Sequence, residues 1–269
     1  MEKVGVVKTT IGSLKQEPGF EKELADETLF GRTVKILEEN EEGWYFVETD
    51  YRYKGYIHES QLLIDESCSK WDEEANHIFN WGIGDAMAEP RYQSFPILQL
   101  TRGAIIKLTG KEKEEWVEIE IPNGKIGWIR RDFVGERTRT RQGQNEKLLR
   151  KRVVETALTY LGTQYRWGGK STLGIDCSGL CSITYLINGI IIYRDSQIKE
   201  EFGMKRISKE EIQLGDLLYY PGHVAMYIGN DKYIHATGKS SGVVINSLNP
   251  EDEDYREDLA NIKEIATVF

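Results

Sequence analysis

The first half of the chain carries an internal repeat. Residues 31–62 align without a gap with residues 103–134, at an offset of 72, and glycine and tryptophan recur at matching positions, as at Trp44 and Trp116. Within each copy, short runs alternate apolar and polar residues and are separated by polar turns, which is the period of half-buried strands. The pattern predicts two small all-β units.

The segment between the two copies, residues 66–80, is polar and predicts a linker or a short helix. It holds Cys68 and His77, whose separation of nine residues is not a metal-site spacing. His58, near the end of the first copy, belongs to no motif either. We assign no chemistry to these three residues.

The second half begins with a helix signal. A basic stretch at residues 137–144 predicts a linker, and a stripe of apolar residues at helical spacing follows it from Leu148 to Leu161. Gly162 is predicted to end this helix.

A second helix is predicted to begin at Cys177. Asp176 has the residue type of a helix N-cap, which leaves Cys177 in the first turn, where free N–H groups and the helix dipole stabilise an anion. That environment is expected to lower the pKa of the thiol and produce a thiolate nucleophile. The alternative is a cysteine that is merely small and buried. Cys181, one turn later, has the spacing of neither a redox motif nor a zinc motif, and we assign it to the core.

Two of the four histidines, His223 and His235, lie on a predicted β-hairpin. Residues 229–231, Gly-Asn-Asp between alternating runs, are a strong turn signal. A loop with an odd number of residues, such as these three, puts both histidines on one face of the sheet, and an even loop puts them on opposite faces. A thiol nucleophile needs a base, and the base needs a third group that orients it. His223 and His235 are the candidates for these two roles.

A zinc ion bound by Cys177, His223 and His235 is the competing hypothesis. The ligand types are acceptable, but no fourth ligand is identifiable in the sequence. We therefore favour cysteine catalysis over a metal site and expect neither a metal nor a cofactor. An imidazole base with its ordinary pKa of about 6–7 would make activity fall as the pH drops through that range.

The charge balance of the chain restricts the kinds of partner that it is expected to bind. The chain has 35 Lys and Arg against 44 Asp and Glu, a net charge of −9, which disfavours a nucleic-acid binder or a protein held on an anionic membrane or wall by charge alone. The start of the sequence shows no apolar run after a basic stretch, and no window approaches the roughly 18 apolar residues of a spanning helix. Three cysteines without framework spacing fit a reducing compartment. We expect a cytoplasmic monomer with a small partner, or else a secreted protein whose leader is absent from this sequence.

Several short motifs follow one another in the second half: Tyr165-x-Trp167-Gly168-Gly169, Asp176-Cys177-Ser178-Gly179, Arg194-x-Ser196-Gln197, Gly215-Asp216-Leu217, His223-Val224-Ala225-x-Tyr227-Ile228-Gly229 and Tyr233-Ile234-His235-Ala236. In this order they resemble the NlpC/p60 family of papain-like cysteine peptidases, which cut peptides of bacterial peptidoglycan. The resemblance implies that Cys177 attacks an amide next to a γ-D-glutamyl residue, that His223 is the base and that His235 orients it. It also places five residues around the peptide: Tyr165, Trp167, Asp176, Ser178 and Ser196.

The end of each repeat, a Gly-aromatic-Ile segment followed by a polar stretch and Leu or Val, resembles a bacterial SH3-like domain. The two resemblances together imply an α+β protein. Residues 1–66 would form one SH3-like barrel, and residues 67–140 a second barrel with its linker. Residues 141–269 would form a papain-like NlpC/p60 catalytic domain, with helices packed on an antiparallel sheet.

The pair of SH3-like domains narrows the resemblance to the γ-D-glutamyl-L-diamino acid endopeptidases. In that group the first SH3-like domain roofs the active site, and a tyrosine with an acidic residue captures the free amine of an N-terminal L-Ala. The tyrosine corresponds to Tyr53, and the acidic residue is Glu23, Asp26 or Glu27, a choice that the sequence leaves open.

The substrate implied by this resemblance is a free murein peptide, cut after D-Glu and before meso-diaminopimelate or L-Lys, with release of L-Ala-D-Glu for cell-wall recycling. The alternatives are a secreted peptidoglycan hydrolase, a wall-binding protein with SH3-like adhesion domains, and acyl transfer in place of hydrolysis.

Overall fold

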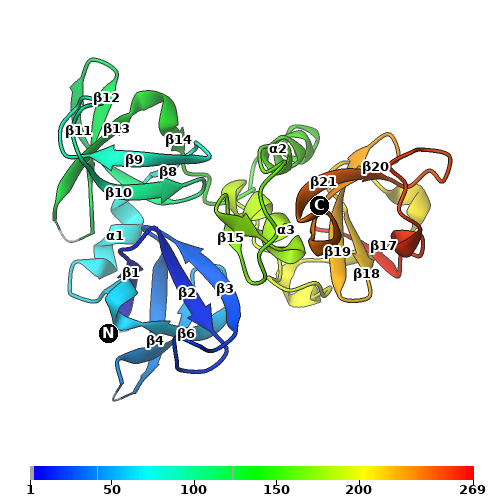
Figure 1. Ribbon diagram of the computed structural model, residues 1–269, viewed down its shortest axis with the longest axis horizontal. Coiled ribbons are helices and arrows are strands. Elements are labelled where there is room, and N and C mark those ends of the chain that lie inside the picture. Colours follow the sequence, from blue (N-terminus) through cyan, green and yellow to red (C-terminus); the bar gives the residue numbers. More distant parts are fainter. Residues whose placement is uncertain (1–2, 41, 123) are drawn as a thin grey trace. The chain divides into compact units, whose positions relative to one another are not determined.

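The computed structural model describes residues 3–40, 42–122 and 124–269. The chain divides into two compact units, Met1–Arg137 and Thr138–Phe269, which are described separately (Figure 1). No helix within the described residues is long and apolar enough to cross a membrane.

The first unit contains two small barrels, each built on a seven-stranded antiparallel sheet. In the first barrel the strands lie in the order β3-β2-β6-β5-β4-β1-β7, and six of them, all but β3, contribute residues to one apolar core. Its elements are β1 (Val4–Val7), β2 (Ile11–Lys15), β3 (Leu24–Leu29), β4 (Thr33–Glu39), β5 (Trp44–Thr49), β6 (Lys54–His58), the 3-10 turn η1 (Glu59–Gln61) and β7 (Leu62–Leu63).

The second barrel repeats this order as β10-β9-β13-β12-β11-β8-β14. The offset of 72 holds beyond the aligned segment, because the pair Leu14 and Asp26 between β2 and β3 has its counterpart in Ala86 and Leu98 between β9 and β10. Its elements are β8 (His77–Phe79), β9 (Ile83–Met87), β10 (Pro96–Thr101), β11 (Ile105–Lys113), β12 (Trp116–Glu120), β13 (Ile126–Arg130), the 3-10 turn η2 (Arg131–Phe133) and β14 (Val134–Glu136).

A short helix, α1 (Cys68–Glu74), joins the two barrels. Trp71 packs with Val6 and Ile105 in one apolar cluster, and its Nε1 donates to the carbonyl oxygen of Gly31 at 2.8 Å. Gly31 has φ of +76°, and a Cβ there would lie 2.0 Å from the carbonyl oxygen of Ile105, so glycine is required at this contact. The short helix predicted as the alternative to a linker in residues 66–80 is confirmed, and the same stretch also contains β8, the first strand of the second barrel, which the sequence did not predict.

The second unit packs helices on an antiparallel six-stranded sheet of order β17-β22-β18-β19-β20-β21. The helix α3 lies against β19 and β20, which carry the two histidines. The helices and turns are α2 (Glu146–Leu158), α3 (Cys177–Ile187), η3 (Glu200–Phe202), η4 (Lys209–Glu211), η5 (Gly238–Ser240) and η6 (Glu257–Leu259). The strands are β15 (Lys170–Ser171), β16 (Gly174–Ile175), β17 (Lys205–Ile207), β18 (Leu217–Tyr220), β19 (His223–Gly229), β20 (Lys232–Thr237), β21 (Gly242–Ser247) and β22 (Glu264–Thr267).

The helix α2 differs from the predicted stripe at both ends. It stops at Leu158, three residues before the predicted end, and turns lead on to Gly162, whose φ is +78°. Leu148 and Leu161 are 61% and 46% exposed, so neither belongs to the buried face. Arg150 takes a place on that face instead, because its guanidinium is paired with the buried carboxylate of Asp216 at 2.8 Å.

Candidate active site

The start of α3 carries the candidate nucleophile. Asp176 precedes the helix with extended backbone angles, and its Oδ1 accepts a hydrogen bond from the N–H of Gly179 at 2.6 Å. The predicted N-cap is thereby confirmed, and Cys177 is the first helical residue. Gly179 is required because a Cβ at this position would lie 2.1 Å from the carbonyl oxygen of Gly169.

The carboxylate of Asp176 also ties the helix start to a buried arginine. Arg194 is 2% exposed and donates from Nη1 to Oδ1 and from Nη2 to Oδ2 of Asp176, each at 3.1 Å. The same guanidinium donates to Oγ of Ser178 at 2.8 Å, and the N–H of Gly168 donates to Oδ2 of Asp176 at 2.8 Å. Both carboxylate oxygens thus accept at least two hydrogen bonds each. The predicted position of Asp176 beside a substrate amine stays a prediction.

The thiol of Cys177 is buried beside β19. Burial, followed by the charge of Asp176, raises its pKa to about 11, although the backbone N–H groups of Val224 and Ser178 and the charge of Arg194 act in the opposite direction. The prediction of a lowered thiol pKa is therefore wrong, because the loss of solvent outweighs the stabilisation of an anion at the helix start. In the resting protein the sulfur carries its proton.

The hairpin of β19 and β20 brings the two histidines to one face, as predicted, but by a different route. The loop has two residues, Asn230 and Asp231, with φ of 51° and 55°, which is the type I′ geometry. Such an even loop alone would put the histidines on opposite faces. A β-bulge at Ile228 adds one residue to β19 and restores the shared face.

On that face the side chains form a hydrogen-bonded series. His223 Nε2 lies 2.7 Å from His235 Nδ1, and His235 Nε2 lies 2.9 Å from Oδ1 of Asn246 on β21. Burial lowers the pKa of His223 to about 3, with the neighbouring His235 and Arg256 acting in the same direction. Burial likewise lowers the pKa of His235 to about 4. Both imidazoles are therefore neutral at physiological pH, and the prediction of a base that titrates near its ordinary pKa is wrong.

The geometry does not favour zinc. A ring nitrogen of His223 faces a ring nitrogen of His235 at hydrogen-bond distance, which leaves no room between them for an ion. Among the described residues, no group of three or more His, Cys, Asp or Glu side chains is arranged to hold a metal. Cys181 is 1% exposed and lies in the core.

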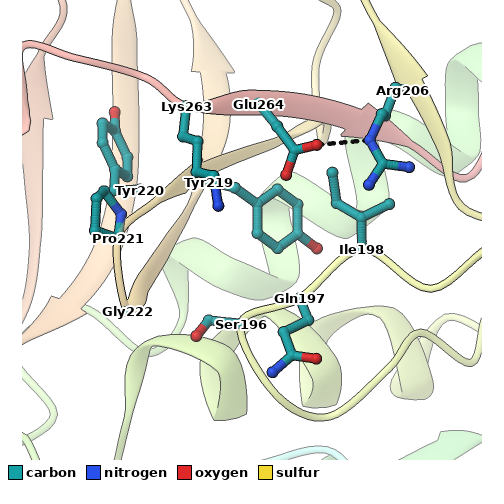
Figure 2. Close-up of a pocket in the computed structure, with 10 residues that line it drawn as sticks. All are labelled: Ser196, Gln197, Ile198, Arg206, Tyr219, Tyr220, Pro221, Gly222, Lys263 and Glu264. Carbon is teal, nitrogen blue, oxygen red and sulfur yellow. Dashed lines mark hydrogen bonds and ion pairs between the residues drawn. The ribbon is translucent and has the colours of Figure 1, made fainter.

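A cavity of about 380 Å³ opens beside the turn that leads into His223 (Figure 2). One wall is the end of β18 with the turn Pro221–Gly222, and Ser196 with Gln197 forms another. Lys263 also lines the cavity, as do Arg206 and Glu264, which pair with each other at 2.6 Å. Within the described part of the chain, Lys263 has no ion-pair partner, so the cavity carries a surplus positive charge.

Comparison with known protein families gives three matches. Residues 162–257 match the NlpC/P60 family, residues 14–62 match the bacterial dipeptidyl-peptidase Sh3 domain, and residues 85–137 match the variant SH3 domain. A dipeptidyl-peptidase 6 of Lysinibacillus sphaericus is 40% identical over 269 residues, which cover 98% of this chain and 99% of the relative. The chain belongs to the NlpC/P60 family. It is a cysteine peptidase of that family with two SH3-type domains.

One further relative and one solved structure are also similar to this chain. A gamma-D-glutamyl-L-lysine dipeptidyl-peptidase of Bacillus cereus is 28% identical over 211 residues, 69% of this chain and 61% of the relative. The crystal structure of an NlpC/P60 family protein from Bacillus cereus ATCC 10987 aligns with a TM-score of 0.79, over 97% of this chain and 98% of that chain, at 20% identity. The predicted α+β fold, with two SH3-like barrels before an NlpC/P60 domain, is confirmed.

Three more predicted residues lie in the NlpC/P60 unit. Tyr165 is half-buried, and burial followed by the nearby Cys177 raises its pKa to about 12, so its hydroxyl stays protonated. Trp167 is 62% exposed. Ser196 lines the cavity beside His223. Their contacts with a substrate remain predictions.

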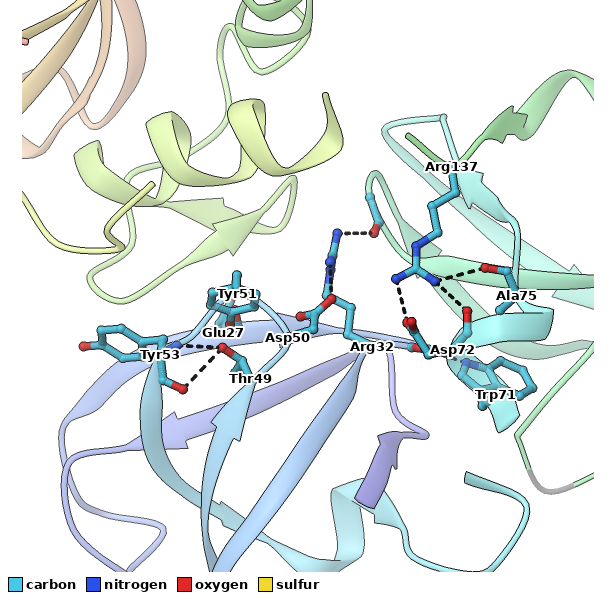
Figure 3. A network of polar contacts seen from close by, with 12 residues as sticks. Glu27, Arg32, Thr49, Asp50, Tyr51, Tyr53, Trp71, Asp72, Ala75 and Arg137 are labelled. Carbon is cyan, nitrogen blue, oxygen red and sulfur yellow. Dashed lines mark hydrogen bonds and ion pairs between the residues drawn. The ribbon is translucent and has the colours of Figure 1, made fainter. Parts of the chain in front are cut away.

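Tyr53 lies in the first barrel, where its backbone N–H donates to Oγ1 of Thr49 at 3.0 Å (Figure 3). The same barrel buries a second tyrosine, Tyr51, whose Oη donates to Oδ2 of Asp26 at 2.6 Å. Of the three acidic candidates, Asp26 and Glu27 are 0% and 3% exposed, whereas Glu23 is exposed. The structure therefore separates the three carboxylates by burial.

Sequence reasoning missed two of these residues, Tyr51 and Asn246. Asn246 shares a sheet face with His235 because its neighbour two positions earlier, Val244, pairs with His235. The alternation along β21 would have found Asn246 once the pairing of β20 with β21 was known. Tyr51 lies in a turn outside the strands, so no periodic pattern marks it.

Proposed function

We propose that this chain is a cysteine endopeptidase that hydrolyses the γ-D-glutamyl–diamino acid bond of free murein peptides with an N-terminal L-Ala, releasing L-Ala-D-Glu. The observation that carries the proposal is the hydrogen-bonded pair His223 and His235 on the strands that pack against α3, whose first residue is Cys177. The names of the relatives, a dipeptidyl-peptidase and a gamma-D-glutamyl-L-lysine dipeptidyl-peptidase, support the choice of bond.

The raised thiol pKa and the lowered imidazole pKa define how the reaction begins. The resting pair is a neutral thiol and a neutral imidazole, so the proton leaves the Cys177 sulfur for His223 as the sulfur attacks the γ-carbonyl carbon. The backbone N–H of Cys177 at the helix start donates to the oxyanion of the tetrahedral intermediate. His223 then gives its proton to the amine of the leaving diamino acid, and the carbon–nitrogen bond breaks to leave a thioester.

Water completes the reaction. His223, neutral again after the amine leaves, accepts a proton from a water molecule that attacks the thioester carbonyl. The carbon–sulfur bond breaks, and the thiolate recovers the proton from His223, which restores the resting pair. His235 acts through its hydrogen bond to His223, which keeps the ring of the base in place.

The cavity beside His223 is the proposed place for the leaving diamino acid. It is lined by the turn Pro221–Gly222, which precedes the base His223 in the chain, and its surplus positive charge at Lys263 attracts a carboxylate. Both diaminopimelate and lysine have an α-carboxylate, whereas diaminopimelate has a second one on its side chain. A Lys263→Met variant should therefore lose more activity on the diaminopimelate peptide than on the lysine peptide, and a Lys209→Met variant, at an exposed position outside the cavity, should lose none.

The first barrel is proposed to bind the free amine of the substrate. Tyr53 and one buried acidic residue would form this site, as the resemblance to the endopeptidases implies. Tyr53→Ala should then impair cleavage of a free-amine peptide more than cleavage of its N-acetylated form. An unchanged preference would mean that the amine is bound elsewhere.

We also propose that the enzyme works as a cytoplasmic monomer. All three cysteines are free and buried, which fits a reducing compartment. Light scattering of the purified protein measures its mass in solution, and fractionation of the host cells locates it. A dimer, or protein recovered from the medium, would contradict this proposal.

Mass spectrometry of the cleavage products tests the main proposal. Wild type should release L-Ala-D-Glu from L-Ala-γ-D-Glu-meso-diaminopimelate or its L-Lys counterpart, and Cys177→Ala should lower the rate by about a thousandfold or more. Cys181→Ala is the matched control, since it removes a buried thiol one helical turn away and should leave cleavage largely intact. Cleavage of intact sacculi or of acetylated peptide would favour a wall hydrolase, and full activity of Cys177→Ala would remove Cys177 as the nucleophile.

A further inference from the structure

The histidine pair is the middle of a longer series that ends on a backbone carbonyl. Asn246 accepts from His235 through Oδ1 at 2.9 Å, and its Nδ2 donates to the carbonyl oxygen of Asp254 at 2.6 Å. A carbonyl oxygen has no proton to give, so the last hydrogen bond has one possible direction. This direction determines which atom donates in each of the other hydrogen bonds of the series, back to His223.

The donor and the acceptor of each remaining hydrogen bond can be assigned in turn, starting from Asn246. Because Nδ2 of Asn246 faces the carbonyl, its Oδ1 faces His235 and must accept, which puts the proton of His235 on Nε2. In a neutral ring Nδ1 is then the acceptor, so His223 donates to it from Nε2. The lone pair of His223 is left on Nδ1, the one ring nitrogen outside the series.

We infer that Asn246 is a positioning residue that sets the tautomer of both His235 and His223, and so keeps the basic nitrogen of His223 available to the Cys177 thiol. The inference rests on the proposed function for its consequence in catalysis, but its structural content does not depend on the substrate. A flipped Asn246 amide would set two oxygens against each other at the Asp254 carbonyl, which disfavours the alternative.

The segment that carries the Asp254 carbonyl, to which Asn246 is anchored, is held by several contacts. Lys232 Nζ lies 2.7 Å from a carboxylate oxygen of Asp252 and 2.7 Å from one of Asp254, which fixes the segment to β20. The N–H of Ser247 donates to the same Asp254 carbonyl at 3.3 Å. These contacts fix the position of the Asp254 carbonyl, and the hydrogen bond to this carbonyl in turn fixes the orientation of the Asn246 amide.

The charged groups near the imidazoles are also paired. Arg256 acts on both rings to disfavour their protonation, and Asp258, which pairs with Arg256 at 2.7 Å, acts in the opposite direction. The effect of Arg256 is the larger of the two at both rings, so the direction of the series is set by hydrogen bonds rather than by a carboxylate at its end. This arrangement differs from a triad that ends on an anion, because the protonated base receives no neutralising charge.

Two variants of Asn246 separate the tautomer from the anchor. Asn246→Asp can still accept from Nε2 of His235, but it no longer donates to the Asp254 carbonyl when ionised. Asn246→Leu loses both contacts. If Asn246 served merely to hold the segment at Asp254, the two variants would behave alike, whereas control of the tautomer makes them differ.

Nitrogen NMR of the full-length protein labelled with ¹⁵N-histidine reads the tautomers directly, and the chain has four histidines to resolve. Wild type should show His223 and His235 with the proton on Nε2. Asn246→Asp should keep both tautomers, and Asn246→Leu should give mixed populations. Asn261→Leu, at an exposed position, is the matched control and should leave the spectrum of both rings unchanged.

Kinetics supplies the second measurement. Asn246→Leu should lower kcat by about tenfold to a hundredfold, the usual cost of losing a residue that orients a functional histidine, with little change in KM. Asn246→Asp should retain more activity, and the acid limb of its pH profile should move to higher pH because an anion now faces His235.

Three results would overturn the inference: a wild-type His223 with its proton on Nδ1, a Leu variant that keeps both tautomers, or equal losses of kcat in the two variants. If Asn246→Leu fails to fold, the wild-type and Asn246→Asp spectra still decide the tautomers. A wild type that cleaves no murein peptide would contradict the proposed function while leaving the NMR test of the tautomers intact.

Discussion

The first barrel and the histidine series of the second unit bury polar groups in opposite ways. The first barrel keeps charges, with Arg32 and Asp50 in an ion pair at 2.8 Å (Figure 3). The carboxylate of Asp26 in the same barrel accepts a hydrogen bond from Tyr51. The histidine series of the second unit is neutral, because burial keeps both rings unprotonated. Charged and neutral networks respond differently to mutation and to pH, so the contrast can be measured.

The second barrel shows that an SH3-like barrel can form without charged residues at the positions of Asp26, Arg32 and Asp50. At the positions that match Asp26, Arg32 and Asp50 at the offset of 72, it has Leu98, Ala104 and Pro122. Ala104 lies in the apolar core of that barrel. Because an ion pair taken out of water rarely stabilises a fold more than apolar residues of similar volume, we expect the first barrel to tolerate the joint replacement of Arg32 and Asp50 by apolar residues.

The largest expected effect is the loss of stability of the second unit in mild acid. The folded pKa values of His223, about 3, and His235, about 4, lie below the ordinary value of 6.5. Below pH 6.5 the unfolded chain therefore binds more protons than the folded one, and the free energy of unfolding should fall by about 3–4 kcal/mol between pH 7 and pH 5. Hydrogen exchange of β19 and β20 peptides measures this change, which should level off near pH 3.

Two controls sharpen this prediction. Carboxylates whose pKa is lowered by ion pairs, such as Asp258 beside Arg256, lose their contribution mainly below about pH 4, outside the range tested. A His223→Leu variant removes one of the two imidazoles and should show about half of the pH dependence. Equal pH dependence in wild type and His223→Leu would mean that the buried rings are not its source.

The next effect concerns the charged network. Arg32→Met leaves the Asp50 carboxylate without its partner and also removes a hydrogen bond to the carbonyl oxygen of Gly103 in the second barrel. Breaking a buried ion pair on one side should cost about 3 kcal/mol in urea unfolding. The double variant Arg32→Met with Asp50→Leu should recover most of that loss, since it copies the apolar solution of the second barrel.

An exposed ion pair provides the comparison for Arg32. Arg131 pairs with Glu112 on the surface of the second barrel, and Arg131→Met should cost less than about 1 kcal/mol. If the two arginine variants were equally destabilised, burial would not be what distinguishes the two pairs.

A smaller effect is expected for the buried tyrosine. Burial and the nearby Asp26 hold the pKa of Tyr51 well above 10, so its hydroxyl remains a donor. Tyr51→Phe leaves the Asp26 carboxylate short of one hydrogen bond and should cost about 1–2 kcal/mol in the same unfolding measurement. Tyr92→Phe in the second barrel, where the ring is 69% exposed, should change stability very little.

The contrast between the two networks also marks where sequence reasoning stops. The repeat and the N-cap at Asp176 follow from local patterns, whereas the shared face of His223 and His235 was expected from an odd loop that the structure does not have. The bulge at Ile228, on which that shared face depends, is not visible in a turn signal, because an even loop with a bulge and an odd loop without one give the same alternation.

The protonation states of the site residues could not be predicted from local sequence patterns. A cysteine at a helix start predicts a lowered pKa from local structure, whereas the burial that raises the pKa of Cys177 comes from the strands packed against α3. Asn246 depends likewise on the pairing of β20 with β21 and on the segment that returns to Asp254. Such long-range contacts have no signature in the residues next to them.

Substitutions of the acidic residues of β3 are expected to have the smallest effect on stability, but they test the proposed amine-binding site. Asp26 and Glu27 are neighbours on one strand, so their side chains point to opposite faces, and the Asp26 carboxylate is already turned to Tyr51. We expect Glu27 to bind the substrate amine. Glu27→Gln should reduce the preference for free-amine over acetylated peptide by about tenfold, since a buried carboxylate is lost, and should shift stability by less than about 1 kcal/mol. Asp26→Asn should change the preference less, and Glu23→Gln, at an exposed position, should not change it. A loss of preference confined to Asp26→Asn would assign the amine to the network of Tyr51 instead.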